Sequence, residues 1–301
     1  MRKRSHVSGT LHKDETMKRI VYFIFCLLLS ASCGEKIVTV EKIVTETVTE
    51  TVTDTLTIVE KDTVEVASPV PSTPSWGYSP VRIGIIGDSI STFGGWIPGE
   101  YVAFYPNTDS GIINVEQTYW HRLIYRLMPD AVLDRNLAYS ATCVTKTGSG
   151  TQYDLNDFVT RVDQTGFDDP DIVIIHGGTN DRRASTSAHA PLGDYGYDEP
   201  LEELDRYCFR SSYVCLVRKI MEKHPGVKIV CIIGDTLNTE KYQDLADSIK
   251  AIADHYGFPT VSFTYALESA DGVHPSLYGA EYMANRIFEV LEAEGLLYYK
   301  R

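Results

Sequence analysis

The chain has 301 residues, and 43% of them are hydrophobic, which is enough for one sizeable core and a small appendage. Its formal net charge is −13, which argues against a nucleic-acid partner, because phosphate binding needs a basic surface. Segment 34–66 contributes −5 of this charge, since eight acidic residues stand there against three lysines.

The first part of the chain has the pattern of an export signal. Lys18 and Arg19 precede a short apolar run over 20–29, and small residues then lead to Cys33. The run is too short to cross a bilayer, which takes about 20 apolar residues as a helix. We therefore expect residues 1–33 to form a secretory signal peptide.

Cys33 resembles the lipidated cysteine of a bacterial lipoprotein signal, although Leu29 lies one place further upstream than the usual leucine. The resemblance implies an exported protein, periplasmic or at the cell surface, that contacts the membrane only through a lipid anchor. An ordinary signal peptide cut nearby is the alternative, and Met17 is an alternative start of translation.

Residues 34–80 are low in complexity. Thr, Val, Ile and Glu dominate the first part, and four prolines lie in 69–80. The β-branched residues disfavour a helix, and no Gly–Pro punctuation favours a sheet. We interpret 34–80 as a tether, and an oligomerisation stalk is the alternative.

From residue 81 to 301 the pattern predicts one α/β domain, in which apolar strands alternate with helices. Strands are expected at 81–86, 131–135, 171–175, 227–233 and 260–263. Helices are expected at 118–127, 201–224, 240–256 and 276–291. Continuous apolar strands between helices indicate a parallel sheet covered on both faces.

Polar side chains occur where this sheet should bind a ligand, beyond the carboxyl ends of its strands. The first strand leads into Gly-Asp-Ser at 87–89, and the third leads into Gly-Thr-Asn-Asp at 178–181. Near the end of the domain, Asp-Gly-Val-His at 271–274 precedes Pro275, which suits the first turn of a helix.

These residue types are the ones that acyl transfer needs. The Ser89 hydroxyl is a poor nucleophile until a base removes its proton. His274 can take that proton and later deliver it to a leaving group. A carboxylate such as Asp271 fixes the tautomer and stabilises the imidazolium. We expect these three residues to converge as a catalytic triad.

Taken in this order, the three blocks resemble the SGNH/GDSL hydrolase family over essentially all of 81–295. The resemblance implies a serine esterase with the fold of that family. This fold is a three-layer α/β/α sandwich with a flavodoxin-like parallel sheet of about five strands.

The resemblance also implies an oxyanion hole formed by Ser89, Ala141 and Asn180. The middle position departs from the family, which usually has a glycine after an asparagine; here Ala141 follows Asn136 at the matching place. A backbone N–H survives the change from glycine to alanine, at low strain only if φ is below zero.

The long segment 92–116 contains the aromatic residues Trp96, Tyr101, Phe104 and Tyr105, and the candidates for binding substrate are Trp96, Tyr101 and Tyr105. Aromatic rings beside a catalytic serine could stack on sugars, and packing within the domain is the alternative. The loop 184–199 is a candidate for another wall of the site.

Three further titratable residues are expected to be structural. We expect Asp88 to hydrogen-bond the nucleophile turn, His176 to be a satisfied core histidine, and His121 to lie on a helix surface. No phosphate loop or metal cluster is evident, so we expect neither a metal nor a cofactor.

The six cysteines form no Cys-x-x-Cys pair, which argues against a structural zinc site. Cys208 and Cys215 are candidates for a disulfide in an oxidising compartment. Free, mostly buried thiols are the alternative.

The leading functional hypothesis is hydrolysis of small acyl esters, above all O-acetyl groups on a glycan. A lipase, a lysophospholipase or a thioesterase is the enzymatic alternative. A glycan-binding surface lipoprotein without activity is the alternative from another class, and fold alone does not decide among them.

Overall fold

The computed structural model describes residues 79–181, 190–234, 243–263 and 268–299. The expected signal peptide with Cys33 and the tether up to residue 78 lie outside the described residues. Residues 184–189 of the loop at 184–199 also lie outside them.

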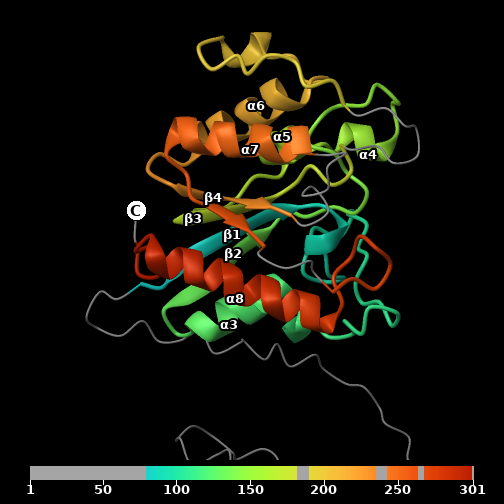
Figure 1. Ribbon diagram of the computed structural model, residues 1–301, viewed down its shortest axis with the longest axis vertical. Coiled ribbons are helices and arrows are strands. Elements are labelled where there is room, and N and C mark those ends of the chain that lie inside the picture. The colour runs from blue at the N-terminus through green and yellow to red at the C-terminus, as the bar shows by residue number, and fades with distance from the viewer. Residues whose placement is uncertain (1–78, 182–189, 235–242, 264–267, 300–301) are drawn as a thin grey trace, which may run out of the picture. The chain divides into compact units, whose positions relative to one another are not determined.

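Five parallel strands form one sheet in the order β2-β1-β3-β4-β5 (Figure 1). Their bounds are β1 (Val81–Gly87), β2 (Ala131–Asn136), β3 (Ile172–His176), β4 (Lys228–Ile233) and β5 (Thr260–Ser262). Each of the five expected strands is present to within two residues at either end. In the register of β1 against β3, Gly87 lies opposite His176, so both strands end at the same edge of the sheet.

Helices cover both faces of the sheet, with α3 and α8 on one side and α5, α6 and α7 on the other (Figure 1). Their bounds are α3 (Tyr119–Leu127), α4 (Gln152–Leu155), α5 (Phe158–Gln164), α6 (Phe209–Lys223), α7 (Gln243–Tyr256) and α8 (Leu277–Ala293). This arrangement confirms the expected three-layer α/β/α fold.

The long helix expected over 201–224 is wrong in its first part. Residues Leu201–Glu203 form a separate 3₁₀ turn, and α6 begins only at Phe209. Between them, the carboxylate of Asp205 accepts a hydrogen bond from the Tyr207 N–H at 2.8 Å. Such a local bond offers the backbone an alternative to helix formation.

The helices α4 and α5 were not predicted, because each is too short to show an amphipathic period. Helix α5 starts at an N-cap, where Asp157 accepts a hydrogen bond from the Thr160 N–H at 3.2 Å.

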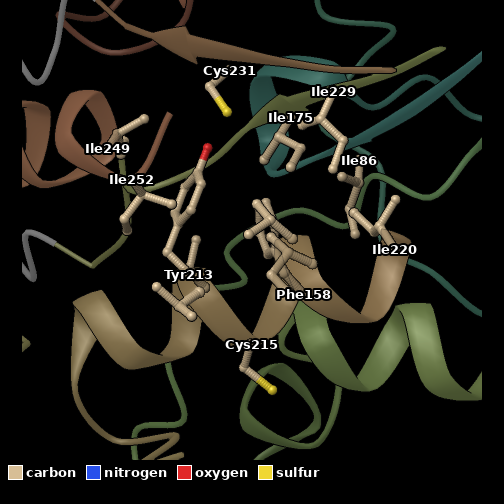
Figure 2. Close-up of a cluster of buried hydrophobic side chains, with 14 of the residues drawn as sticks. Ile86, Phe158, Ile175, Tyr213, Cys215, Ile220, Ile229, Cys231, Ile249 and Ile252 are labelled. Carbon is tan, nitrogen blue, oxygen red and sulfur yellow. The ribbon is translucent and has the colours of Figure 1, made fainter. Parts of the chain in front are cut away.

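Strand β3 divides its side chains between two cores, as the twofold period of a strand requires. Val173 and Ile175 join the core beneath α5, α6 and α7, whereas Ile172 and Ile174 join the core beneath α3 and α8. Figure 2 shows Ile175 in the first core, with Tyr213 and Ile220 of α6 packed nearby. Each large aliphatic side chain buried in this way contributes about 1.5–3 kcal/mol to stability.

The described cysteines are free, and the candidate pair Cys208 and Cys215 is not bonded. These two residues are seven positions apart at the start of α6, a rise of about 10 Å at 1.5 Å per residue, which is beyond the reach of a disulfide. Within the ranges described above, no helix combines the length and apolar character needed to cross a membrane.

Candidate active site

Ser89 lies at the carboxyl end of β1, on a short 3₁₀ turn over Ser89–Ser91. The Asp88 carboxylate caps this turn by accepting a hydrogen bond from the Ile90 N–H at 3.1 Å. Gly87 is required before the turn, because a Cβ there would collide with the Ser91 side chain. The serine itself is 6% exposed.

The structure places His274 beside Ser89, although the two residues are 185 positions apart in the sequence. Its Nε2 lies 2.8 Å from the Ser89 Oγ, and its Nδ1 lies 2.7 Å from the Asp271 Oδ2. The imidazole therefore connects a carboxylate to a serine hydroxyl through two hydrogen bonds, which is the arrangement expected from the sequence.

The Asp271 loop is organised before helix α8 begins. The other oxygen of Asp271 accepts hydrogen bonds from the N–H groups of Val273 at 3.0 Å and His274 at 2.8 Å. Burial raises the pKa of the Asp271 carboxyl, but the hydrogen bonds from His274 and Val273 outweigh burial and hold that pKa below its ordinary value. Asp271 thus stays ionised beside the imidazole.

Asn180 follows β3, and its amide group is fixed by the neighbouring loop. The Nδ2 donates to the Thr142 carbonyl at 3.0 Å, which leaves its second hydrogen for another acceptor. The next residue, Asp181, accepts from the N–H groups of Val144 at 2.8 Å and Thr145 at 2.9 Å. The Thr145 hydroxyl also donates to Asp181 at 2.7 Å, so hydrogen bonds hold residues 180–181 to the loop at 142–145.

Asn136, which the sequence offered only as the partner of Ala141, also ties the site together. Its Nδ2 donates to the Ser91 carbonyl at 2.9 Å, and its Oδ1 accepts from the Ala138 N–H at 2.9 Å. The end of β2 is thereby joined to the nucleophile turn at the end of β1.

Comparison with known proteins decides the family. Residues 81–291 match the GDSL-like Lipase/Acylhydrolase family. The chain belongs to this family. No curated protein sequence matches it.

Two solved structures that are similar to most of the chain support the same assignment. Structures described as GDSL-like lipases from Bacteroides uniformis and Bacteroides ovatus are each 30% identical, with TM-scores of 0.61. Each covers 71% of this chain, and the match covers 96% and 99% of those chains, respectively. A protein from Lactobacillus plantarum shares the fold, with 20% identity and a TM-score of 0.50. The match covers 71% of this chain and 98% of that protein.

Ala141 is where this GDSL-family domain carries strain. Its φ is +63°, so the condition for an unstrained alanine is not met. It is the one non-glycine residue with positive φ among those the structure describes. The left-handed conformation costs an L-residue roughly 1–2 kcal/mol, and glycine adopts it freely. The exposed Ala141 therefore occupies a backbone conformation that suits the glycine usual in the GDSL family.

Two of the three aromatic residues expected to bind substrate are buried in this GDSL-family domain. Tyr105 is 1% exposed, and Tyr101 stacks on Tyr139 with ring centroids 4.7 Å apart. Both rings pack within the domain, as the alternative interpretation stated. Trp96 is 43% exposed and remains the aromatic candidate on the surface.

Phe104, in the same segment, contacts the candidate base directly. Its ring stacks on the imidazole of His274, with centroids 3.6 Å apart and planes 7° apart. No sequence pattern distinguishes Phe104 from its aromatic neighbours, so this contact needed the structure.

Two further histidines, His176 and His121, were expected to be structural. His176 is buried, but its Nδ1 has no hydrogen-bond partner among the described residues, so it is not a satisfied core histidine. Burial lowers the pKa of His176 to about 4, so the ring is neutral at pH 7. His121 lies on α3 and is half-buried, with its ring packed edge-on against Trp96 at 5.6 Å between centroids. Burial lowers the pKa of His121 as well.

Asp88 caps the turn as expected, and its carboxyl also has a raised pKa. It is fully buried, and burial raises its pKa to about 6 against the opposing hydrogen bond from Ile90. Across the described ranges, no group of three or more His, Cys, Asp or Glu side chains is arranged to hold a metal ion.

Proposed function

We propose that this GDSL-family protein is a serine esterase that hydrolyses small acyl esters through Ser89, His274 and Asp271, above all O-acetyl groups on carbohydrate. The observation that carries the proposal is the pair of contacts at His274, 2.8 Å to the serine Oγ and 2.7 Å to the carboxylate. Short contacts on both ring nitrogens are what a general base between nucleophile and carboxylate requires.

In the proposed reaction, the Ser89 Oγ attacks the acyl carbon while its proton passes to Nε2 of His274. Asp271 accepts a hydrogen bond from the Nδ1–H and stabilises the imidazolium. The ester C–O bond then breaks, and His274 gives its proton to the leaving alcohol. Water next attacks the acyl-enzyme, His274 takes the proton of that water, and the carboxylic acid leaves as Ser89 regains its hydrogen.

The carbonyl oxygen becomes an oxyanion during each attack. In the proposal, the N–H groups of Ser89 and Ala141 and the amide of Asn180 donate to it. The half-buried Asn180 suits this role because one amide hydrogen is already held by Thr142 at 3.0 Å. A donor fixed in advance pays no reorganisation cost when charge develops.

The proposal of a small acyl group on a glycan rests on surface chemistry and on sequence. Trp96 presents an aromatic face at the surface of the segment that also carries Phe104. An exposed ring of this kind suits sugar stacking. The sequence offers no long apolar segment that would line a tunnel for a long acyl chain.

The decisive experiment compares wild type with Ser89→Ala on p-nitrophenyl esters of increasing chain length and on acetylated oligosaccharides. We expect turnover of acetyl esters by the wild type and near-complete loss in Ser89→Ala, with thermal unfolding unchanged. Undiminished turnover in the variant would refute Ser89 as the nucleophile. Preference for chains of eight or more carbons would favour a lipase or lysophospholipase, and binding of glycan without turnover would favour a binding protein.

The cellular location is a separate proposal that rests on the sequence alone. A signal ending at Cys33 and a tether over 34–80 would hold the domain at a membrane by a lipid. Expression of Cys33→Ala in a bacterial host, followed by membrane fractionation, tests this. Release of the variant into the soluble fraction is the expected result, and equal membrane retention of both proteins would contradict the anchor.

A further inference from the structure

A buried arginine lies beneath the candidate site, on a helix that the sequence did not reveal. Arg161 of α5 is 1% exposed, and its guanidinium lies over the Phe158 ring at 4.3 Å. Burial lowers the pKa of Arg161 to about 10, which leaves it charged at neutral pH. A buried charge is costly, so its hydrogen-bond partners indicate what it is retained for.

The partners of Arg161 belong to the loops that carry the candidate nucleophile and oxyanion donors. Its Nη1 donates to the carbonyl of Gly87 at 3.0 Å and also to that of Leu137. Its Nη2 donates to the Thr142 Oγ1 at 3.0 Å, and its Nε donates to Asn156 at 3.0 Å. None of these four partners carries a negative charge.

Gly87 is the last residue of β1, two positions before Ser89. The Gly87 carbonyl also accepts a hydrogen bond from the Tyr139 N–H at 3.1 Å. One carbonyl at the end of the nucleophile strand is thus shared by Arg161 and by the turn that contains Ala141.

The other end of that turn is Thr142. Its Oγ1 donates to the Tyr139 carbonyl at 2.7 Å and accepts from Arg161. Its N–H points to the same carbonyl at 3.4 Å. The turn from Tyr139 to Thr142 is therefore closed around the left-handed Ala141, and Arg161 binds the hydroxyl that closes it.

We propose that Arg161 is a positioning residue, which fixes the Ala141 N–H relative to Ser89 by joining the end of β1 to the turn at 139–142. The inference rests on the proposed esterase function. Its basis is that one rigid guanidinium fork reaches both segments, whereas a lysine ammonium has no planar fork to span them. Arg161 acts through the backbone and does not touch substrate.

The test compares Arg161→Lys with the wild type on p-nitrophenyl acetate. We expect kcat to fall at least about tenfold and KM to change less than about threefold, because the oxyanion donor serves mainly the transition state. Turnover is counted per Ser89 labelled to completion by a fluorophosphonate, which removes any misfolded fraction. Arg135→Lys is the matched control, since Arg135 also donates to carbonyls, those of Thr165 and Gly166, and is partly exposed.

Two further variants test the contact between Arg161 and the turn at 139–142. Thr142→Val keeps the side-chain shape and removes the hydroxyl, so kcat should fall in the same way and add little to Arg161→Lys. Ala141→Gly in the Arg161→Lys background should restore kcat at least about threefold, because glycine adopts the left-handed turn without support. Additive losses in the first pair, or no recovery in the second, would overturn the proposal. If Arg161→Lys does not fold, Thr142→Val decides alone.

A readout without activity separates this inference from the proposed function. Amide hydrogen exchange at Thr142 should quicken at least about tenfold in Arg161→Lys, while exchange in β1 stays unchanged. Unchanged exchange at Thr142 would overturn the positioning role whatever the enzyme does. If wild type and Ser89→Ala turn over ester equally, the esterase proposal fails. If turnover depends on Ser89 but Arg161→Lys keeps its kcat, only the positioning role fails.

Discussion

The imidazole of His274 lies face to face on the ring of Phe104, with centroids 3.6 Å apart and planes 7° apart. The stack is tied to the nucleophile turn through Thr92. The Phe104 N–H donates to the Thr92 Oγ1 at 2.8 Å, and that hydroxyl donates to the Ser89 carbonyl at 2.9 Å. An aromatic face attracts a cation, so the ring should favour the imidazolium that the proposed acyl transfer would form.

Replacing Phe104 with leucine should keep the apolar cover and remove the aromatic face. We expect kcat/KM to fall about fivefold, which corresponds to about 1 kcal/mol of lost cation–π attraction. Phe104→Tyr keeps the ring and serves as the control. Steady-state kinetics on p-nitrophenyl acetate measure kcat/KM, and an unchanged value in Phe104→Leu would show that the aromatic face does not act on the imidazole.

Asn180→Ala should lower kcat about a hundredfold and leave KM almost unchanged. The reason is that the oxyanion exists mainly in the transition state, so its donor contributes little to ground-state binding. Steady-state kinetics on p-nitrophenyl acetate measure both constants, and thermal unfolding checks that the loop held at Thr142 persists. A change confined to KM would assign Asn180 to substrate binding only.

Asp88→Asn should change how stability depends on pH. The pKa of Asp88 rises from 3.8 in the unfolded chain to about 6 in the folded one. Between these values the folded carboxyl holds a proton that the unfolded one has released, so raising the pH lowers the free energy of unfolding. Asparagine does not titrate, so the variant should gain on the wild type from pH 4 to pH 6, by up to about 3 kcal/mol.

Urea unfolding at pH 4, 5, 6 and 7 measures this gap for Asp88→Asn. Asparagine keeps an oxygen for the Ile90 N–H, and its amide replaces Asp88 Oδ2, which has no hydrogen-bond partner among the described residues. We therefore expect equal stability near pH 4 and a constant gap above pH 6. Parallel curves across this range would mean that Asp88 has an ordinary pKa.

Trp96→Ala should raise KM for an acetylated oligosaccharide more than it raises KM for p-nitrophenyl acetate, because only the glycan offers rings to stack on. The ratio of the two KM values is the measurement. Tyr125→Ala is the matched control, since Tyr125 is an aromatic residue on α3 that is 70% exposed. Equal ratios in the two variants would remove Trp96 from the substrate site.

The sequence predicted the fold well because the central strands β1, β3 and β4 are largely apolar and buried. Ile172–His176 is buried at every position, which leaves no ambiguity about a strand covered on both faces. The convergence of Ser89 with His274 was also predictable, since residues that follow parallel strands share one edge of the sheet.

What the sequence did not reveal depends on short elements and on tertiary contacts. Helix α5 has only seven residues, so its pattern is too brief to read, and Arg161 was therefore not singled out. The burial of Tyr101 and Tyr105 was not evident either, because an aromatic residue in a loop gives no sign of which way its ring points. The positive φ of Ala141, and the hydrogen bond from Arg161 to the neighbouring Thr142, were likewise not evident from the sequence.

Ser89 and His274 are 185 positions apart in the sequence, so the chain acquires them at different times during synthesis. The ribosome delivers Ser89 with β1, long before His274 emerges ahead of α8. A nascent chain, or a chain that has lost its C-terminal part to a protease, therefore carries the Ser89 hydroxyl without His274 beside it. Chemical competence comes only when nearly the whole domain has emerged and closed.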